Sequence, residues 1–100
     1  MAKSIIQKEK ECFVCRMYLG VETKQNLHRH HVFEGTSNRK QSEKYGMTVW
    51  LCAPHHNMSN DGIHFNKVLD LKVKEYAQSI FEANLGNRDD FRRIFGRSYL

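Results

Sequence analysis

Long apolar runs are missing from this sequence. No stretch of the 100 residues approaches the roughly 18 consecutive apolar residues that a membrane-spanning helix needs. The opening residues MAKSIIQKEK also lack the apolar segment of about 7 to 15 residues that is typical of a signal peptide. Repeats, low-complexity segments and linkers are absent as well, so we expect one domain over 1–100 that is cytoplasmic and has no membrane partner.

Cysteine is scarce, and three cysteines cannot all pair with one another. Disulfides are rare in the cytosol, so metal ligation explains these residues better. All three cysteines and all six histidines lie between positions 12 and 64. The segments CFVC at 12–15 and CAPH at 52–55 repeat one spacing, and tetrahedral zinc takes a Cys3His set. The sequence therefore predicts a structural zinc held by Cys12, Cys15, Cys52 and His55. A redox-active thiol pair is disfavoured because no βαβ pattern surrounds it.

Acidic side chains are fewer than basic ones: the sequence has 11 Asp and Glu and 16 Lys and Arg, which gives a formal net charge of +5. The excess lies in the first fifty residues, which carry nine basic and five acidic side chains. This balance favours a polyanionic partner. The candidate phosphate contacts are Arg29, Arg39, Lys40 and Lys44. No motif for reading bases is evident, so we expect weak sequence preference or a protein partner that supplies specificity.

Local patterns predict an α+β fold. Two β-compatible runs, 27–33 and 47–52, should pair as antiparallel strands. The intervening 34–46 contains Gly, Ser and Asn together with cations, and is expected to be an exposed basic loop. A short helix is expected over 54–60, and a long helix over 65–85 whose apolar stripe faces the core. Asn87 should cap a last helix, with Asp89 and Asp90 in its first turn.

Five histidines remain once the zinc ligands are assigned: His28, His30, His31, His56 and His64. The stretches ECFVC, LHRHHVF and WLCAPHHN resemble the HNH endonucleases of the ββα-metal (His-Me finger) class in their zinc-bracketed form. The resemblance covers about 12–64. It implies a ββα-metal core with a zinc knuckle over 11–64, followed by a helical extension over 65–100 with a long amphipathic and a short C-terminal helix.

The same resemblance implies roles for individual residues. His31 would be the general base, and His30 the ligand of a catalytic ion. Asn57 would be the ligand from the helix, with His56 as an adjacent competitor and His64 as a possible further ligand. Thr48 stands where the family commonly has an Asn that orients the base. A threonine hydroxyl can make only part of an amide's hydrogen bonds, so this step differs from the family pattern.

The implied activity is metal-dependent hydrolysis of DNA phosphodiesters by a His31-activated water, leaving 5′-phosphate and 3′-hydroxyl ends. Mg²⁺, Mn²⁺, Ni²⁺ and Zn²⁺ are all compatible with nitrogen and oxygen ligands. Compact proteins of this kind look like those of phages and other mobile elements. One alternative is a zinc-stabilised DNA-binding or interaction module of the same fold with weakened catalysis. Another is a structural domain that uses the whole ligand set for two zinc ions.

Overall fold

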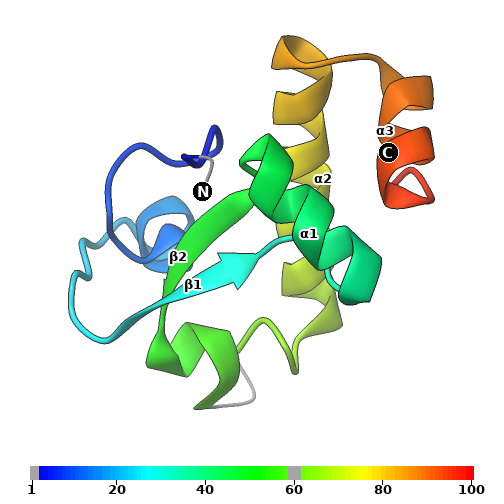
Figure 1. Cartoon of the computed structure of the whole chain (residues 1–100). Helices are drawn as coiled ribbons and strands as arrows, with labels where there is room; N and C mark the ends of the chain where they lie inside the picture. The colour runs from blue at the N-terminus through cyan, green and yellow to red at the C-terminus, as the bar shows by residue number, and fades with distance from the viewer. Residues whose placement is uncertain (1–2, 59–61) are drawn as a thin grey trace.

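The structure, a computed structural model, describes residues 3–58 and 62–100. These residues form an α+β fold with one two-stranded antiparallel sheet and three α-helices (Figure 1). The elements in chain order are η1 (Cys15–Leu19), β1 (Leu27–His31), α1 (Thr36–Tyr45), β2 (Thr48–Cys52), η2 (Pro54–Met58), α2 (Lys67–Asn84) and α3 (Arg88–Phe95). The two η elements are single π-helical turns.

The two predicted strands form and pair antiparallel, with Leu27 opposite Cys52 and His31 opposite Thr48. β1 ends at His31, two residues earlier than the sequence pattern predicts, and β2 begins at Thr48. Side chains alternate between the two faces of a strand. His28 and His30 therefore lie on one face of β1, and Arg29 and His31 lie on the other.

The predicted basic loop is wrong, because most of 34–46 is helix α1. Its turn formers occupy only the first turn, and the rest is rich in Arg, Lys, Gln and Glu, which are good helix formers. Gly46 ends the helix in a left-handed conformation at φ 72°. The buried Ser42 ties α1 to the end of β1: its hydroxyl donates to Phe33 O at 2.9 Å and accepts from Phe33 N at 3.2 Å.

The long helix predicted over 65–85 is confirmed as α2, which begins after its cap Asn66 and ends at Asn84. Helix α3 follows, with Asn87 as its predicted cap in a reciprocal capping box with Asp90. One buried core spans β2, α2, α3 and the segments beside η1 and β1. It is built from aromatic rings, with Phe33 4.6 Å from Phe95 and 5.0 Å from Phe91 between ring centroids.

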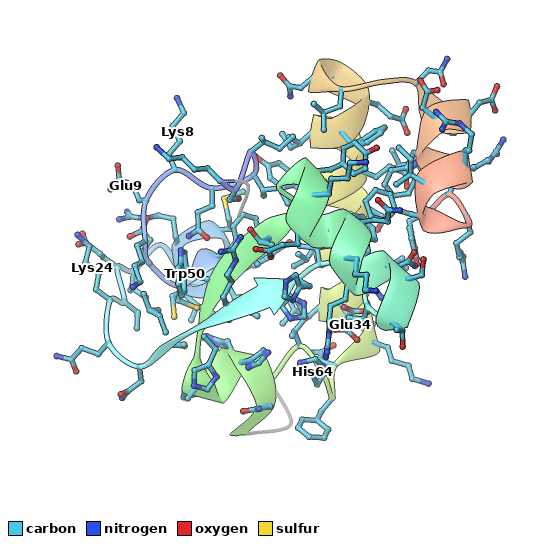
Figure 2. The ribbon with its side chains drawn as sticks, in the orientation of Figure 1. Lys8, Glu9, Lys24, Glu34, Trp50 and His64 are labelled. Carbon is cyan, nitrogen blue, oxygen red and sulfur yellow. The ribbon has the colours of Figure 1, made fainter. Side chains whose placement is uncertain are left out.

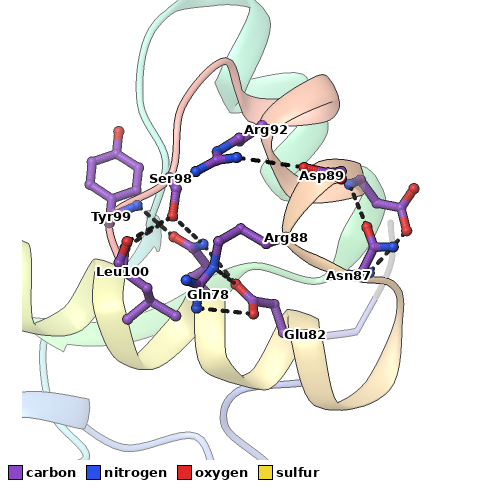
Figure 3. A network of polar contacts seen from close by, with 10 residues as sticks. Gln78, Glu82, Asn87, Arg88, Asp89, Arg92, Ser98, Tyr99 and Leu100 are labelled. Carbon is purple, nitrogen blue, oxygen red and sulfur yellow. Dashed lines mark hydrogen bonds and ion pairs between the residues drawn. The ribbon is translucent and has the colours of Figure 1, made fainter.

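The buried polar residue Gln78 fastens the chain end to α2 (Figure 3). Its amide nitrogen donates to Glu82 at 2.8 Å and to Ser98 at 2.9 Å, and its oxygen accepts from Tyr99 N at 2.7 Å. All polar atoms of the amide group are thus paired inside the protein. No helix among the described residues is long and apolar enough to cross a membrane.

Candidate metal and catalytic centre

Three thiols and one imidazole converge where the N-terminal knuckle meets the end of β2. The sulfurs of Cys15 and Cys52 are 3.8 Å apart. His55 Nδ1 lies 3.7, 3.3 and 3.2 Å from the sulfurs of Cys12, Cys15 and Cys52. A tetrahedral zinc with bonds of about 2.3 Å to sulfur separates two sulfurs by about 3.8 Å, and a sulfur and a nitrogen by about 3.5 Å. The four predicted residues therefore form a group that could hold a metal ion such as zinc.

The local structure suits thiolate ligands. Cys12 precedes η1 and Cys15 begins it; both are buried, and the Cys15 N–H donates to the Cys12 sulfur at 3.4 Å. Burial raises the pKa of Cys52 to about 12 in the metal-free protein. An ion that binds Cys52 as a thiolate must therefore displace a proton. All three cysteines are free of disulfides.

A second group consists of His30, His56 and His64, whose ligand nitrogens lie within 4.8 Å of one another. His30 comes from β1, His56 from η2, and His64 from the turn before α2. His30 is only 2% exposed, and its buried Nε2 has no hydrogen-bond partner among residues 3–58 and 62–100. An unsatisfied buried nitrogen costs about 1–3 kcal/mol, which a bound ion would offset.

A line of polar contacts orients these imidazoles. His56 Nδ1 is 2.9 Å from His28 Nδ1, and His56 Nε2 is 3.0 Å from His64 Nε2. His64 Nδ1 in turn lies 3.4 Å from the Glu34 carboxylate, beside it in Figure 2. A carboxylate can only accept, so this contact favours a proton on His64 Nδ1 and leaves Nε2 as the ligand atom.

Burial and neighbouring rings keep His30 and His56 in the neutral form that binds metal. Burial lowers the pKa of His30 to about 3, with a further contribution from the nearby ring of His56. Burial also lowers the pKa of His56, helped by His64 and His28. Neutral imidazole is the form that binds metal, so at pH 7 neither His30 nor His56 must lose a proton before it can ligate an ion.

His31 points to the other face of β1 and contacts α1. Its Nε2 is 2.8 Å from Glu43, and the second oxygen of the same carboxylate is 3.1 Å from a guanidinium nitrogen of Arg29. Because the carboxylate only accepts, Nε2 carries the proton. In the neutral ring Nδ1 is then the unprotonated nitrogen, which is the atom a general base needs.

His30 and His31 nevertheless line one cavity of about 290 Å³, because the strand ends there. The remaining lining residues are Arg29, Glu34, Gly35, Arg39, His56 and His64. A neighbouring cavity of about 850 Å³ shares His31, Gly35 and Arg39, and is completed by Thr36, Lys40, Glu43 and Lys44 of α1. The four predicted phosphate contacts thus lie at these two cavities.

A third ligand group, His30 with Glu34 and Asp70, overlaps the histidine group. His30 belongs to both groups and one nitrogen lone pair binds one ion, so the groups are alternatives for a single ion rather than two sites. Asp70 is held by Lys74 at 2.7 Å, and ligation by its carboxylate would compete with that ion pair. Among the described residues, none of the three histidines is held by a lysine or arginine ion pair of this kind, so the histidine group is favoured.

Two predicted site residues, Asn57 and Thr48, do not lie at the histidine cavity. Asn57 is exposed on η2, and is not among the described residues that line the histidine cavity; its neighbour His56 is. Thr48 is buried directly opposite His31, and its backbone oxygen accepts from the Ser4 hydroxyl at 2.5 Å. The end of the helix predicted over 54–60 lies outside the described residues.

Sequence patterns miss Glu34 and Glu43. Glu34 lies four residues after His30, a spacing that brings two side chains together only if the strand has already ended. Glu43 lies twelve residues after His31, and the contact depends on α1, which the sequence pattern does not predict. The only signal available in the sequence is that the basic segment 34–46 contains two acidic residues, Glu34 and Glu43.

No family model matches the chain, and no curated protein or solved structure matches it either. The geometry of the site itself is therefore the basis for assigning a function.

Proposed function

We propose that the chain is a metal-dependent DNA endonuclease of the HNH class, with a ββα-metal core made by β1, β2 and η2. The observation that carries the proposal is the shared cavity at the end of β1. It brings the imidazole group of His30, His56 and His64 beside His31, whose Nδ1 is free to accept a proton. A binding module would need neither the buried ligand nitrogen nor the oriented base.

In this proposal His31 Nδ1 accepts a proton from the attacking water. Glu43 holds the ring through Nε2 and stabilises the imidazolium that forms. Arg29 and Arg39 line the same cavity and would contact the phosphate, while Lys40 and Lys44 would hold the flanking chain along α1. A divalent ion on the three imidazoles would supply Lewis-acid stabilisation of the charge that develops on the phosphate.

Plasmid nicking tests the proposal directly. The chain is incubated with supercoiled DNA and added Mg²⁺, Mn²⁺, Ni²⁺ or Zn²⁺, and compared with His31→Ala. We expect the variant to lose about 10²–10⁴-fold in rate, the usual contribution of a positioned base, and to keep its fold and its DNA affinity. Equal cleavage by both proteins would refute the role of His31.

A matched pair of lysine variants tests the binding surface. Lys44 lines the cavity beside His31, whereas Lys72 is exposed on α2. Loss of one phosphate contact lowers the slope of log affinity against log salt by about 0.9 for duplex DNA. We expect this change for Lys44→Ala and not for Lys72→Ala. The same loss for both would indicate only a general effect of charge.

The second candidate function is a zinc-stabilised DNA-binding module with weakened catalysis. Two observations favour it: Asn57 lies outside the histidine cavity, and Thr48 stands where the family commonly has an Asn. Salt-sensitive DNA binding without nicking under any of the four ions would support this function over the nuclease.

A further inference from the structure

A second basic cavity lies on the other side of Arg29. It has a volume of about 610 Å³, within the range of ligand pockets, and its lining includes Lys3, Ser4, Gln7, Lys8, Arg29 and Trp50. Three of these are cations, and no Asp or Glu among the described residues lines the cavity. Arg29 also lines the histidine cavity, so the two cavities adjoin.

The wall of this cavity is ordered by hydrogen bonds along the free edge of β2. The Ile5 N–H donates to Gly46 O at 3.0 Å, and Gln7 accepts from the Trp50 N–H at 2.9 Å. Ser4 donates to the Thr48 carbonyl at 2.5 Å. The N-terminal segment is thus attached to β2, which places Lys3, Lys8 and Trp50 in the lining of one cavity.

The Trp50 ring is half-buried and already accepts a cation. Lys10 Nζ lies over the ring at 4.4 Å from its centroid, so a base that stacks on this face must displace the lysine side chain. Figure 2 places Trp50 on the side of the N-terminal segment, away from His64 and Glu34. An indole beside several lysines is the combination by which proteins stack an unpaired base and track its phosphates.

Strand register relates this cavity to the proposed cleavage position. Trp50 pairs with Arg29, and His31 pairs with Thr48, so all four side chains lie on the same face of the sheet. Two residues along a strand span about 6.7 Å, roughly twice the rise of 3.4 Å per nucleotide in one strand of DNA. A DNA strand with its phosphate at His31 would therefore bring a base one to two nucleotides away to Trp50.

We infer that this cavity binds an unpaired nucleotide of single-stranded DNA, with the base stacked on Trp50 and the adjacent phosphates held by Lys3 and Lys8. The inference deepens the proposed function, since it names single-stranded DNA, or a duplex with an unpaired stretch, as the substrate class. Fully paired DNA cannot offer a base to the ring without unstacking it.

Trp50 is the only tryptophan of the chain, so its fluorescence reports on this cavity alone. The full chain with its structural zinc is titrated with oligothymidylate and with a matched duplex, without added catalytic ion. We expect oligothymidylate to quench the emission in a saturable manner and the duplex to leave it nearly unchanged. Equal quenching by duplex, or binding of oligothymidylate without quenching, would overturn the inference.

Two kinds of variant separate stacking from charge. Trp50→Leu should weaken binding of oligothymidylate roughly 5- to 150-fold, the range expected for one stacked base, and leave the salt slope unchanged. Trp50→Phe keeps an aromatic face and should retain most of the affinity. Lys8→Gln should lower the salt slope by about 0.7. Unchanged affinity of a correctly folded Trp50→Leu would refute the stacking role.

The experiments distinguish failure of the single-strand binding site from failure of the proposed endonuclease activity. Nicking that depends on His31, without quenching of Trp50, would leave the endonuclease intact and remove the single-strand site. Quenching by oligothymidylate without any nicking would retain the site on a protein that binds DNA and does not cleave it.

Discussion

Removal of the ion from the Cys3His group should unfold the protein. The four ligands join η1 to the end of β2, and Cys15 and Cys52 are 37 positions apart in the chain. Cys12 and Cys15 are also buried members of the core, together with their neighbours Phe13 and Val14. Without an ion, the three thiols and one imidazole would face one another in a buried space with little to compensate their desolvation.

The size of the effect follows from the size of the chain. A 100-residue domain has a free energy of unfolding of about 5–15 kcal/mol. Structural zinc contributes an apparent binding free energy of about 10–16 kcal/mol at neutral pH in small zinc domains. The two ranges overlap and the binding free energy is centred on the higher value, so the metal-free chain is expected to have no cooperative folded state at 25 °C.

Metal analysis and thermal unfolding, with and without a strong chelator, measure this effect. His55→Ala removes one ligand, and His55→Cys restores a closed set of four thiolates that also suits zinc. We expect about one tightly bound zinc and a cooperative transition in the parent and in His55→Cys, and neither in His55→Ala. His56→Ala is the matched control, because it removes an adjacent histidine outside the zinc group.

Proton release gives this prediction a second measurement. A cysteine of an unfolded chain has a pKa of about 8.5, so the thiols of the metal-free chain are mostly protonated at neutral pH and lose their protons when the metal binds. Each proton displaced weakens metal affinity about tenfold for each unit of decrease in pH. Less chelator should therefore suffice for unfolding at pH 6 than at pH 8. A metal-free chain that unfolds at the same temperature as the parent would refute the reasoning.

Two further predictions concern the histidines of β1. The pKa of His30 is about 3 when folded and near 6.5 when unfolded, so the unfolded state binds more protons between these values and stability falls as pH falls through this window. Chemical denaturation of the parent relative to His30→Gln, without a second ion, should show a loss of about 2 kcal/mol between pH 7 and pH 5; parallel pH profiles would contradict this. Glu43→Ala should lower kcat at least about tenfold with little change in KM, whereas Glu43→Gln keeps an acceptor for His31 and should recover part of the rate; equal losses in both would exclude a positioning role.

The zinc group could be predicted from the sequence because its chemistry is local. Two ligand pairs with the same short spacing each form a turn, and only one tetrahedral ion suits both pairs. The cap of α3 is local in the same sense, since Asn87 and Asp90 satisfy each other's backbone within one turn. Such features depend only on residues that are close together in the chain. They can therefore be predicted without knowledge of the tertiary structure.

Helix α1 could not be predicted on the same grounds. Its sequence has almost no apolar stripe, and it is stabilised by the buried Ser42 and by Tyr45, which packs against Phe81 at 6.1 Å between ring centroids. Glu43, which contacts His31, lies on this helix, and Glu34, which contacts His64, lies in the turn before it. The contacts that orient the histidines are therefore tertiary, although the histidines themselves form a recognisable pattern.

The end of β1 explains how one strand can serve two chemical roles. Adjacent residues of a strand point to opposite faces, so His30 and His31 cannot share a surface in the middle of a sheet. At the last residue of the strand, however, the chain turns into α1 and the sheet no longer separates the faces. His30 can then remain buried with the imidazole group while His31 is held by Glu43 across the same cavity. Adding one residue between them would return His31 to the face of His30 and away from Glu43. For this reason the adjacency of the two histidines, together with the length of β1, is the feature on which the proposed catalytic geometry depends.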